Sequence, residues 1–242
     1  MQISVIIPMY NENKIIEDTA RQLSEYMEET FESYEILFSD DGSTDGCGDT
    51  VRSLNLPSVR VVGYEKNQGK GCAVRTGMLE AKGDLVLFTD ADLAYGMEVI
   101  GAVWEFYRSS DTKADVIIGS RALHSDGYAG YTSLRKLMSK VYVRVLGFVG
   151  GFRLSDSQCG CKAFSLEAAR EIFGRCEVNG FSFDFEAILW SERLGYSVAE
   201  FPVRIINHRD SKIHVLRDSV KMLKSVRKIR NHVRKQPLNK TI

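Results

Sequence analysis

Leu-Val-Leu-Phe-Thr-Asp-Ala-Asp, residues 85–92, is an apolar run that ends in two carboxylates one residue apart. The apolar run predicts a fully buried strand, so Asp90 and Asp92 follow the point where that strand leaves its sheet. Ligands of open α/β sheets bind at this carboxyl edge. Two carboxylates there suit Mg²⁺ or Mn²⁺, which prefer oxygen ligands and share them with substrate phosphates. The alternative is a pair of solvated loop aspartates.

Composition places the chain among ordinary globular proteins. Its 242 residues are 44% hydrophobic and 26% charged, which is enough for a substantial core. We expect no transmembrane helix, because no run of about 18 apolar residues occurs. We also expect no signal peptide, because the first residues lead directly into a strand. Five cysteines, an odd number without a paired framework, predict reduced thiols in a cytoplasmic protein.

The neutral net charge conceals two halves of opposite sign. Residues 1–120 carry 10 Lys/Arg and 21 Asp/Glu, a net of −11, whereas residues 121–242 carry 22 and 11, a net of +11. The acidic half suits a cation site and the basic half suits an anionic partner. Chance segregation of surface charge is the alternative.

The first 120 residues alternate strand and helix patterns. Strands are predicted over 3–8, 34–39, 59–63, 85–89 and 115–119, and helices over 13–29, 73–81 and 97–108. This alternation predicts an α/β fold, a mostly parallel doubly wound sheet flanked by helices. Ser43, Thr44 or Asp45 could cap a helix after the second strand. Loops that follow strands should then gather at one edge of the sheet; they cover 8–12, 40–45, 67–71 and 90–92.

The second half has a looser pattern. A polar, mobile loop is predicted over 122–132, a strand over 197–206, and helices over 133–147, 165–173, 183–194 and 215–233. No internal repeat or linker interrupts the chain, so we expect one domain over residues 1–242.

The last predicted helix is amphipathic and basic. Between Lys221 and Lys235 it carries seven Lys/Arg and no acidic residue. It could pack on the domain, or lie at a membrane surface with its apolar face among the lipid headgroups. A basic helix also suits nucleic acid, but no recognition module accompanies it, so we expect no nucleic-acid partner. The apolar stretch 141–152 could touch a lipid tail or belong to the core.

Four loop motifs follow predicted strands in order. They are Pro-Met-Tyr-Asn-Glu at 8–12, Asp-Asp-Gly-Ser-Thr-Asp at 40–45, Asn-Gln-Gly-Lys-Gly at 67–71 and Asp-Ala-Asp at 90–92. Together they resemble the signatures of family-2 glycosyltransferases with the GT-A fold. Further similarity at 119–121, 156–164, 183–186 and 211–212 extends over nearly the whole chain. These segments are most similar to the polyprenyl-phosphate branch, the dolichyl-phosphate glucosyl- and mannosyltransferases and their prokaryotic relatives.

The resemblance assigns the first half to the nucleotide sugar. It implies a nucleotide-sugar-binding half over 1–120, an acceptor-binding half over 121–213, and a basic C-terminal helix and tail over 214–242. Asp90 and Asp92 would hold the metal against the diphosphate, Asp92 most directly. The implied nucleotide-binding residues are Pro8, Tyr10, Asn11, Glu12, Asp41, Lys70, Asp90, Ala91 and Asp92.

The resemblance assigns the second half to the acceptor and the sugar. The implied acceptor-phosphate residues are Arg121, Arg135, Ser139, Arg209 and Lys212, and the residues implied beside the donor sugar are Gln158, Asp184 and Glu186. Catalytic roles would fall to Asp90, Asp92, Asp184 and Arg121. Asp184 and Glu186 could instead be first-turn acids favoured by a helix dipole. Arg135 and Ser139, four residues apart, could instead be ordinary surface residues.

One departure bears on the sugar. Mannosyltransferases of this branch usually follow the acidic motif with Leu-Gln, whereas this chain has Leu93 and Ala94. Alanine cannot ligate a metal, which favours a glucosyl-type enzyme using UDP-glucose, with GDP-mannose possible.

The acceptor decides whether the reaction needs a base. A phosphate monoester has a second pKa of about 6, so it is already an anion near neutral pH and needs cations to hold it. A sugar hydroxyl would need a general base, for which Asp184 or Glu186 are candidates. A metal would neutralise the departing diphosphate in either case. The resemblance implies inversion at the anomeric carbon.

The sequence therefore predicts an inverting, metal-dependent glycosyltransferase. It would move a hexose, glucose from UDP-glucose being favoured, onto a polyprenyl phosphate, as a peripheral membrane protein at the cytoplasmic face. One alternative of the same fold glycosylates a sugar hydroxyl of a polysaccharide or glycolipid. Another is a nucleotide-sugar-binding protein without turnover. A nucleotidyltransferase is disfavoured, because no glycine-rich phosphate loop lies near the N-terminus.

Overall fold

The protein is built on one mixed sheet. The computed structural model describes residues 1–109, 114–207 and 215–237, with the side chains at 134–135 and 215–224 left undescribed. Within these ranges the sheet has seven strands in the order β3-β2-β1-β4-β6-β5-β7. The strands are β1 (Ile3–Met9), β2 (Tyr34–Asp40), β3 (Val59–Gly63), β4 (Leu85–Phe88), β5 (Val116–Ser120), β6 (Lys162–Ser165) and β7 (Val198–Pro202).

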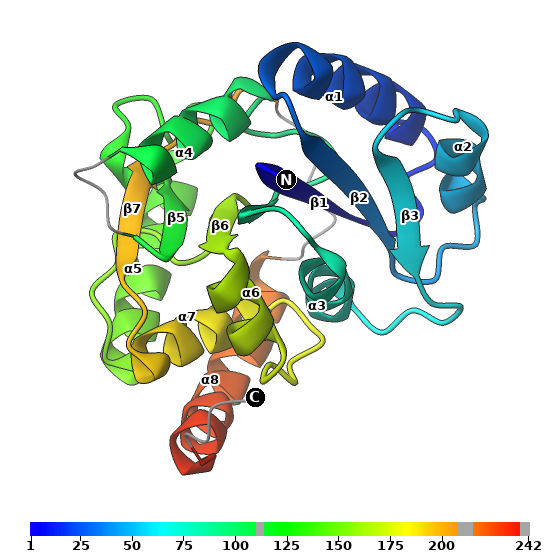
Figure 1. Ribbon diagram of the computed structural model, residues 1–242. Helices are drawn as coiled ribbons and strands as arrows, with labels where there is room; N and C mark the ends of the chain where they lie inside the picture. The colour runs from blue at the N-terminus through cyan, green and yellow to red at the C-terminus, as the bar shows by residue number, and fades with distance from the viewer. Residues whose placement is uncertain (110–113, 208–214, 238–242) are drawn as a thin grey trace.

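Helices cover both faces of the sheet. The helices α1, α2 and α4 lie on one face and α3, α6, α7 and α8 on the other, with α5 beside α7 and α8 (Figure 1). Their bounds are α1 (Ile16–Thr30), α2 (Cys47–Ser53), α3 (Lys70–Glu80), α4 (Glu98–Arg108), α5 (Ser133–Gly150), α6 (Leu166–Phe173), α7 (Phe183–Leu194) and α8 (Val215–Lys235), with a 3₁₀ turn at Arg121–Leu123. The predicted α/β fold with a mostly parallel sheet is confirmed.

Two apolar cores form because the strands are buried on both faces. Along β1, Ile3, Val5 and Ile7 face the core under α1, α2 and α4, whereas Ile6 faces the core under α3, α6 and α7. Strands covered on both sides are nearly continuously apolar, as the sequence indicated. Parallel pairing of β1 with β2 and β4 brings their carboxyl ends to one edge.

Strand β6 was not predicted. It has four residues, begins with a lysine, and runs antiparallel between β4 and β5. Such a short segment lacks the length that periodicity needs, and its partners lie far away in the chain. The strand predicted over 197–206 is also shorter, because it ends at Pro202.

Helix starts differ from the predicted ones. Helix α3 begins at Lys70 rather than at residue 73, directly after Gly69. Gly46, with a left-handed φ of 81°, is the N-cap of α2. Asp45 nevertheless accepts a hydrogen bond from the Cys47 N–H at 3.1 Å, so this residue contributes to the start of the helix.

The described end of α8 packs on the domain. Its side chains Val226, Ile229 and Val233 are buried in the core shared with α6 and α7. Arg227 and Lys228 remain exposed on the outer side. These residues fit the packed-helix interpretation and contradict an apolar face lying in a membrane. Across the described chain, we find no helix with the length and hydropathy that crossing a bilayer requires.

Candidate active site

The loop after β4 carries the acidic pair. Asp90 and Asp92 follow the buried strand by two and four residues, as the sequence predicted. Two hydrogen bonds stabilise the loop: the Thr19 hydroxyl donates to the Ala91 carbonyl at 2.9 Å, and the Ala94 N–H donates to Asp92 Oδ1 at 3.2 Å. The loop therefore presents both carboxylates at the carboxyl edge of the sheet.

Lys70 lies against the acidic pair. Its Nζ is 2.5 Å from Asp90 Oδ1, and both side chains stay partly exposed, at 26% and 33%. Burial by itself would lower the pKa of Lys70, but the nearby charges of Asp90, Asp184 and Asp92 outweigh it and raise that pKa. Lys70 is therefore a cation held over the acidic motif by the first turn of α3.

A second lysine–aspartate pair lies deeper. Asp184 lies in the first turn of α7, and its Oδ1 accepts a hydrogen bond from Lys162 Nζ at 2.7 Å. The Lys162 side chain is 1% exposed, also donates to the Cys159 carbonyl at 2.5 Å, and lies 5.6 Å from the Phe88 ring centroid. Burial raises the pKa of Asp184, and the positive charge of Lys162 opposes but does not cancel that shift.

The loop before β6 packs directly on Asp90. A Cβ on Gly160 would collide with the Asp90 carboxylate, so a larger residue there would displace that side chain. The Gly160 N–H donates to the Tyr95 hydroxyl at 3.1 Å, which anchors the loop. Lys70, Asp90, Lys162 and Asp184 thus form one cluster of alternating charge between β4, α3, β6 and α7.

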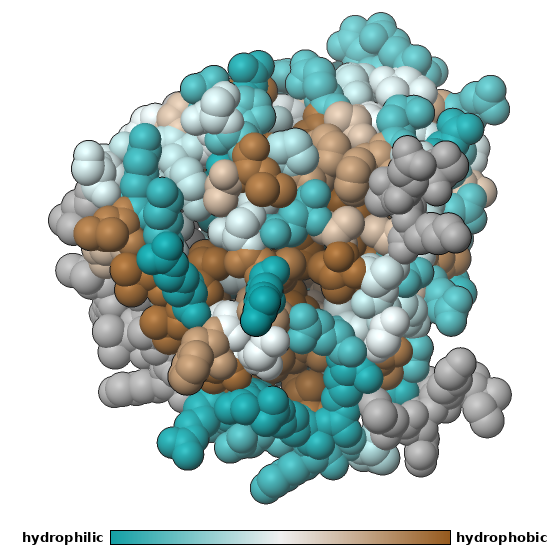
Figure 2. Space-filling view, turned by 90° about the vertical axis from the view of Figure 1, so that its left-hand side faces the viewer, coloured by the Kyte–Doolittle hydropathy of each residue, from teal (hydrophilic) through white to brown (hydrophobic). Residues whose placement is uncertain are grey.

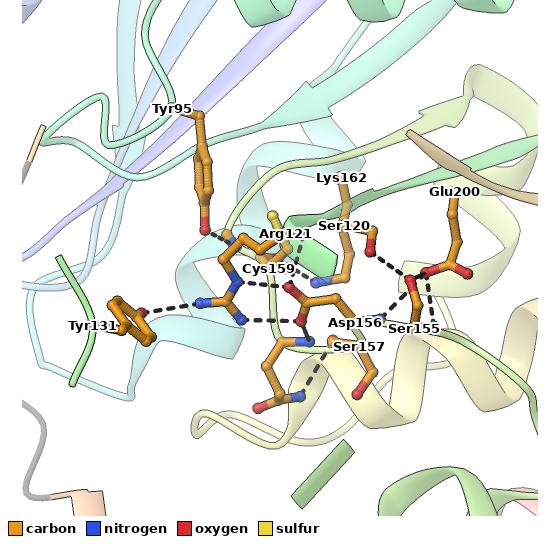
Figure 3. A network of polar contacts seen from close by, with 12 residues as sticks. Tyr95, Ser120, Arg121, Tyr131, Ser155, Asp156, Ser157, Cys159, Lys162 and Glu200 are labelled. Atoms are coloured by element: carbon orange, nitrogen blue, oxygen red, sulfur yellow. Dashed lines mark hydrogen bonds and ion pairs between the residues drawn. The ribbon is translucent and has the colours of Figure 1, made fainter. Parts of the chain in front are cut away.

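Arg121 is bound in a buried ion pair. Its Nε donates to Asp156 Oδ2 at 2.6 Å and one terminal nitrogen donates to Oδ1 at 3.0 Å (Figure 3). The other terminal nitrogen donates to the Tyr131 hydroxyl at 3.1 Å, and the guanidinium lies 5.6 Å from the Tyr128 ring centroid. Burial would lower the pKa of Arg121, but the Asp156 charge raises it well above its usual range. Three of its five N–H groups are used inside the protein.

The Asp156 loop is held by a further carboxylate. Glu200 Oε1 accepts hydrogen bonds from the Ser155 N–H at 2.8 Å and from the Ser155 hydroxyl at 2.6 Å. It also accepts one from the Asp156 N–H at 3.2 Å, and Figure 3 shows this side of the network beside Arg121. Strand β7 therefore braces the loop that neutralises Arg121.

Asp41 ties two of the predicted loops together. It is 3% exposed and follows β2. Its carboxylate accepts hydrogen bonds at 2.7–3.0 Å from the Tyr64 hydroxyl, the Asn67 amide and the Gln68 and Gly69 N–H groups. Burial and the hydrogen bond to Asp41 raise the pKa of Tyr64. In the structure, Asp41 thus shapes the 64–69 loop; its predicted contact with a base stays a prediction.

The first loop is shaped by Asn11. Its left-handed φ of 53° is a conformation that asparagine tolerates, and its N–H donates to the Ser43 hydroxyl at 3.0 Å. Its Oδ1 accepts from the Thr44 N–H at 2.8 Å. Tyr10 beside it is 42% exposed. The predicted neighbours are each half-buried, Pro8 near the end of β1 and Glu12 on the loop that follows.

Glu186 and Gln158 are not placed like Asp184. The Glu186 carboxylate is buried and accepts from the Val178 N–H at 2.8 Å and the Glu177 N–H at 3.0 Å, so it anchors a loop. Gln158 donates from Nε2 to the Ser157 carbonyl at 3.3 Å. Proximity of either residue to a donor sugar stays a prediction.

The acceptor-phosphate prediction lies mostly outside the described residues. Arg209 and Lys212 are not described, and neither is the side chain of Arg135, although its backbone belongs to α5. Ser139 is described as half-buried on α5.

Sequence reasoning assigned no role to Lys162, Tyr95 or Asp156. Lys162 carried a usable signal, because a lysine directly before Ala-Phe in a buried segment requires an anionic partner. The partner itself, Asp184, could not be deduced locally, since it comes from a different element.

The comparisons with known proteins identify the family of this chain. Residues 4–173 match the family model described as glycosyl transferase family 2, so the chain belongs to this family and is a glycosyltransferase. It is 33% identical over 221 residues to "Dolichyl-phosphate beta-glucosyltransferase ALG5C" of Trichomonas vaginalis, covering 87% of this chain but 65% of that relative. It is 31% identical over 243 residues to a dolichyl-phosphate beta-glucosyltransferase of Dictyostelium discoideum, covering 94% and 73%.

A solved structure shares the fold. Glucosyl-3-phosphoglycerate synthase from Mycobacterium tuberculosis, crystallised with Mn²⁺, UDP and phosphoglyceric acid, superposes with a TM-score of 0.71. The sequence identity is 19%, and the match covers 98% of this chain and 79% of the other. This similarity confirms the GT-A architecture.

Proposed function

We propose that this glycosyltransferase moves a hexose, glucose from UDP-glucose, onto a polyprenyl phosphate, with inversion and with Mg²⁺ or Mn²⁺. The observation that carries the proposal is the cluster at the carboxyl edge of the sheet, where Asp90, Asp92 and Lys70 lie beside the Lys162–Asp184 pair. The names of the relatives and the UDP and Mn²⁺ bound to the structural neighbour support the donor and the acceptor.

The residues present fit a divalent cation that is shared with substrate. Among the described residues, no group of three or more His, Cys, Asp or Glu side chains could bind a metal by itself. Asp90 and Asp92 offer two carboxylates, which suits a cation that takes its other ligands from a diphosphate and water. The cation, when bound, supplies Lewis-acid neutralisation of the leaving diphosphate.

Lys70 would act with the acidic motif on the donor. It is charged, partly exposed and within 2.5 Å of Asp90, so a modest rotation can turn its ammonium group toward a phosphate oxygen. Preorganised cations at a leaving group are usually the largest catalytic contribution.

Asp184 is better suited to positioning than to taking a proton. Lys162 holds one of its oxygens at 2.7 Å, inside a nearly closed site. A phosphate monoester acceptor needs no base, because it is already ionised near neutral pH. We therefore propose that Asp184 orients the sugar or the acceptor while Lys162 fixes its rotamer.

Arg121 would act on the acceptor indirectly. Its charge is balanced by Asp156, so it shapes the site wall, and the direct phosphate contacts fall to Arg135, Ser139, Arg209 and Lys212. Replacing Arg135 with glutamine should raise the KM for the lipid phosphate with little change in the KM for the donor. An equal rise in both would contradict this division.

The backbone after the acidic motif bears on the sugar. Leu93 has a left-handed φ of 47°, and the Ala94 carbonyl accepts the Ile206 N–H at 2.8 Å. Ala94 is thus tied to the segment after β7 and offers no side-chain ligand. This supports glucose over mannose.

A second candidate transfers the sugar to a hydroxyl group. The observation in its favour is the raised pKa of Asp184, since a general base works best with a pKa near the working pH. The Asp184→Asn variant distinguishes transfer to a hydroxyl group from transfer to a phosphate. It should abolish transfer to a hydroxyl, whereas transfer to a phosphate should keep a measurable kcat.

The direct test is a transfer assay. Radiolabelled UDP-glucose, UDP-galactose, UDP-N-acetylglucosamine or GDP-mannose would be mixed with a short polyprenyl phosphate and Mg²⁺ or Mn²⁺. We expect labelled lipid from UDP-glucose alone, and none after EDTA or in Asp92→Ala. Slow hydrolysis of a donor without labelled lipid would overturn the proposal that the acceptor is a polyprenyl phosphate. Binding of UDP-glucose without either reaction would overturn the proposed activity.

The place of action follows from the acceptor. A polyprenyl phosphate lies in a bilayer, so we propose a peripheral protein at the cytoplasmic face. The five cysteines, all free and buried, suit a reducing compartment.

A further inference from the structure

A tyrosine hydroxyl on α5 is buried without a hydrogen bond. Tyr142 is half-buried, yet its hydroxyl oxygen is fully buried and has no hydrogen-bond partner among the described residues. Such a group lowers stability, because water bonded to it in the unfolded chain and nothing replaces that water in the folded protein. A phenylalanine would fill the same position without this loss. Packing therefore explains the ring of Tyr142 but leaves its hydroxyl unexplained.

The ring of Tyr142 lies on the side of α5 that packs on α7. Tyr142, Leu146 and Gly150 are spaced four residues apart, so they share one side of the helix. Leu146 and Gly150 are buried, and a Cβ on Gly150 would come into tight contact with the Phe185 ring of α7. Phe148, on the opposite side, is 90% exposed, and Figure 2 shows apolar side chains between polar ones on the surface seen from β7 and α5. Tyr142 thus belongs to the inner side, in the core shared with α7.

The first turn of α7 offers a carboxylate oxygen without a partner. Asp184 Oδ1 accepts the hydrogen bond from Lys162 Nζ, whereas no described residue donates to Oδ2. The Asp184 side chain is 11% exposed, so a ligand in the site can reach it. Burial raises the pKa of Tyr142, and the negative charge of Asp184 adds to that rise, which requires the two groups to lie near each other. An unpaired donor and an unpaired acceptor therefore lie close together.

This combination suits a neutral hydroxyl group of a ligand. A hydroxyl both donates and accepts, so it can donate to Asp184 Oδ2 while it accepts from the Tyr142 hydroxyl. A phosphate oxygen can accept from Tyr142, but the charge of Asp184 would repel it. The proposed acceptor reacts through a phosphate, and the nucleotide is assigned to the loops after β1 and β2. The transferred hexose is the part of the substrates that supplies a hydroxyl here.

The position of Tyr142 along α5 agrees with a hexose beside it. Ser139 and Arg135, which we propose for the acceptor phosphate, precede Tyr142 by three and seven residues and so lie on the same side of the helix. On the other side of the site, the pKa of Asp184 responds to the charge of Asp90 in the acidic motif. The hexose must lie between the acceptor phosphate and the leaving diphosphate, which is the space that Tyr142 and Asp184 border.

We propose that Tyr142 is a specificity-determining residue whose hydroxyl donates a hydrogen bond to one hydroxyl group of the transferred hexose, while that sugar hydroxyl donates to Asp184. The inference rests on the proposed function, because it takes the hexose as the group beside Asp184. The bound sugar gives the Tyr142 hydroxyl the partner that it lacks in the free protein. A donor whose sugar lacks that one hydroxyl leaves Tyr142 unpaired and is discriminated against.

The test compares Tyr142→Phe with the wild type on a series of donors. UDP-glucose and its 2-, 3-, 4- and 6-deoxy analogues would be assayed for transfer to a short polyprenyl phosphate. We expect kcat/KM for UDP-glucose to fall about tenfold in Tyr142→Phe, the effect of one hydrogen bond. In the wild type, one deoxy analogue should lose at least as much, and for this analogue Tyr142→Phe should cause no further loss. Tyr107→Phe, which removes a hydroxyl from a half-buried ring on α4, is the matched control and should behave like the wild type.

Two further measurements show whether the hydroxyl acts on the sugar or on the fold. In thermal unfolding without ligand, Tyr142→Phe should melt at the same temperature as the wild type or higher, because a buried unpaired group is removed. In titration calorimetry with Mn²⁺, its Kd for UDP-glucose should rise and its Kd for UDP should stay unchanged, since UDP carries no hexose. A rise in the Kd for UDP as well would overturn the inference.

The other outcomes are equally decisive. Wild-type kcat/KM and Kd in Tyr142→Phe would show that the hydroxyl contacts no substrate, and the proposed function would stand. An equal further loss with every deoxy analogue, or a rise only in the KM for the lipid phosphate, would also overturn the contact with one sugar hydroxyl. If UDP-glucose binds more weakly to Tyr142→Phe but the wild type labels no lipid phosphate, the sugar contact is supported and the proposed function is overturned.

Discussion

Two lysine–aspartate pairs lie within one cluster but in different environments. The pair of Lys70 and Asp90 is open, with 26% and 33% of the side chains exposed. The pair of Lys162 and Asp184 is closed, at 1% and 11%. Their Nζ–Oδ distances, 2.5 Å and 2.7 Å, are similar, so contact distance does not separate them. The two pairs differ instead in how far their side chains are exposed to solvent.

The difference in exposure indicates that the two pairs have different roles in the site. The open pair can exchange its partner for a cation or a phosphate without exposing a buried charge. The closed pair cannot, because removing either member leaves an uncompensated charge inside the protein. We therefore expect the open pair to act on ligands and the closed pair to maintain geometry. Four measurements test this contrast.

The largest effect is expected from Lys162→Met. Removing the ammonium group leaves Asp184 buried and unpaired, which should lower the free energy of unfolding by about 3–5 kcal/mol. Urea denaturation measures this loss. The double variant Lys162→Met/Asp184→Leu replaces the whole pair with apolar groups and should recover most of the stability. A single variant as stable as the wild type would show that the closed pair is dispensable.

Asp92→Asn should lower activity and leave stability unchanged, in contrast to Lys162→Met, which should lower stability. We expect kcat to fall about 10²- to 10³-fold, because charge stabilisation at the leaving diphosphate is lost. The free energy of unfolding should change by less than about 0.5 kcal/mol, since the residue is on a partly exposed loop. Asp18→Asn, an exposed change on α1, is the control and should leave both quantities unchanged. Full activity in Asp92→Asn would refute the metal site.

Lys70→Met should have an intermediate effect. We expect kcat/KM for the donor to fall about tenfold or more, as one phosphate-directed cation disappears. The loss of stability should stay under about 1 kcal/mol, because a partly exposed ion pair contributes little. Lys66→Met on the preceding exposed loop is the control. A stability loss as large as that of Lys162→Met would erase the contrast between the two pairs.

The smallest effect is expected from Glu186→Gln. Glu186 is a buried carboxylate without a lysine partner, so this variant shows how burial alone affects stability. Burial raises its pKa above the ordinary value of 4.5, so the folded protein binds this proton more tightly than the unfolded chain. The stabilisation is complete below the unfolded pKa and is lost as pH rises through the folded pKa. Relative to Glu186→Gln, the wild type should therefore lose stability on going from acidic to neutral pH in thermal unfolding. A pH-independent difference would mean that the carboxylate is not desolvated.

The nucleotide half was predictable because its information is local. Apolar runs such as residues 85–88 indicate a strand by composition alone, and a motif directly after such a strand must lie at the sheet edge. Asp90, Asp92, Lys70 and Asp41 were located in this way. The hydrogen bonds of the Asp41 carboxylate to the 64–69 loop show the limit, since no local pattern indicated them; its contact with a base stays a prediction.

The second half depended on pairings between distant residues. Arg121 pairs with Asp156, 35 residues later, a partner that no local pattern indicates, and its contact with a phosphate stays a prediction. The sequence did not decide whether the 141–152 stretch belongs to the core or contacts a lipid tail. Only the folded chain shows that α5 turns one apolar side inward and the other outward.

Sequence alone determined the family, the α/β sheet and the positions of the loops, because periodicity and motif order act over a few residues. Tertiary structure alone decided which charges meet. Strand β6 inserts antiparallel between β4 and β5, and that register carries Lys162 to Asp184, 22 residues away. The physical reason is burial: a charge in a closed site must find its partner in space, and only long-range packing chooses that partner.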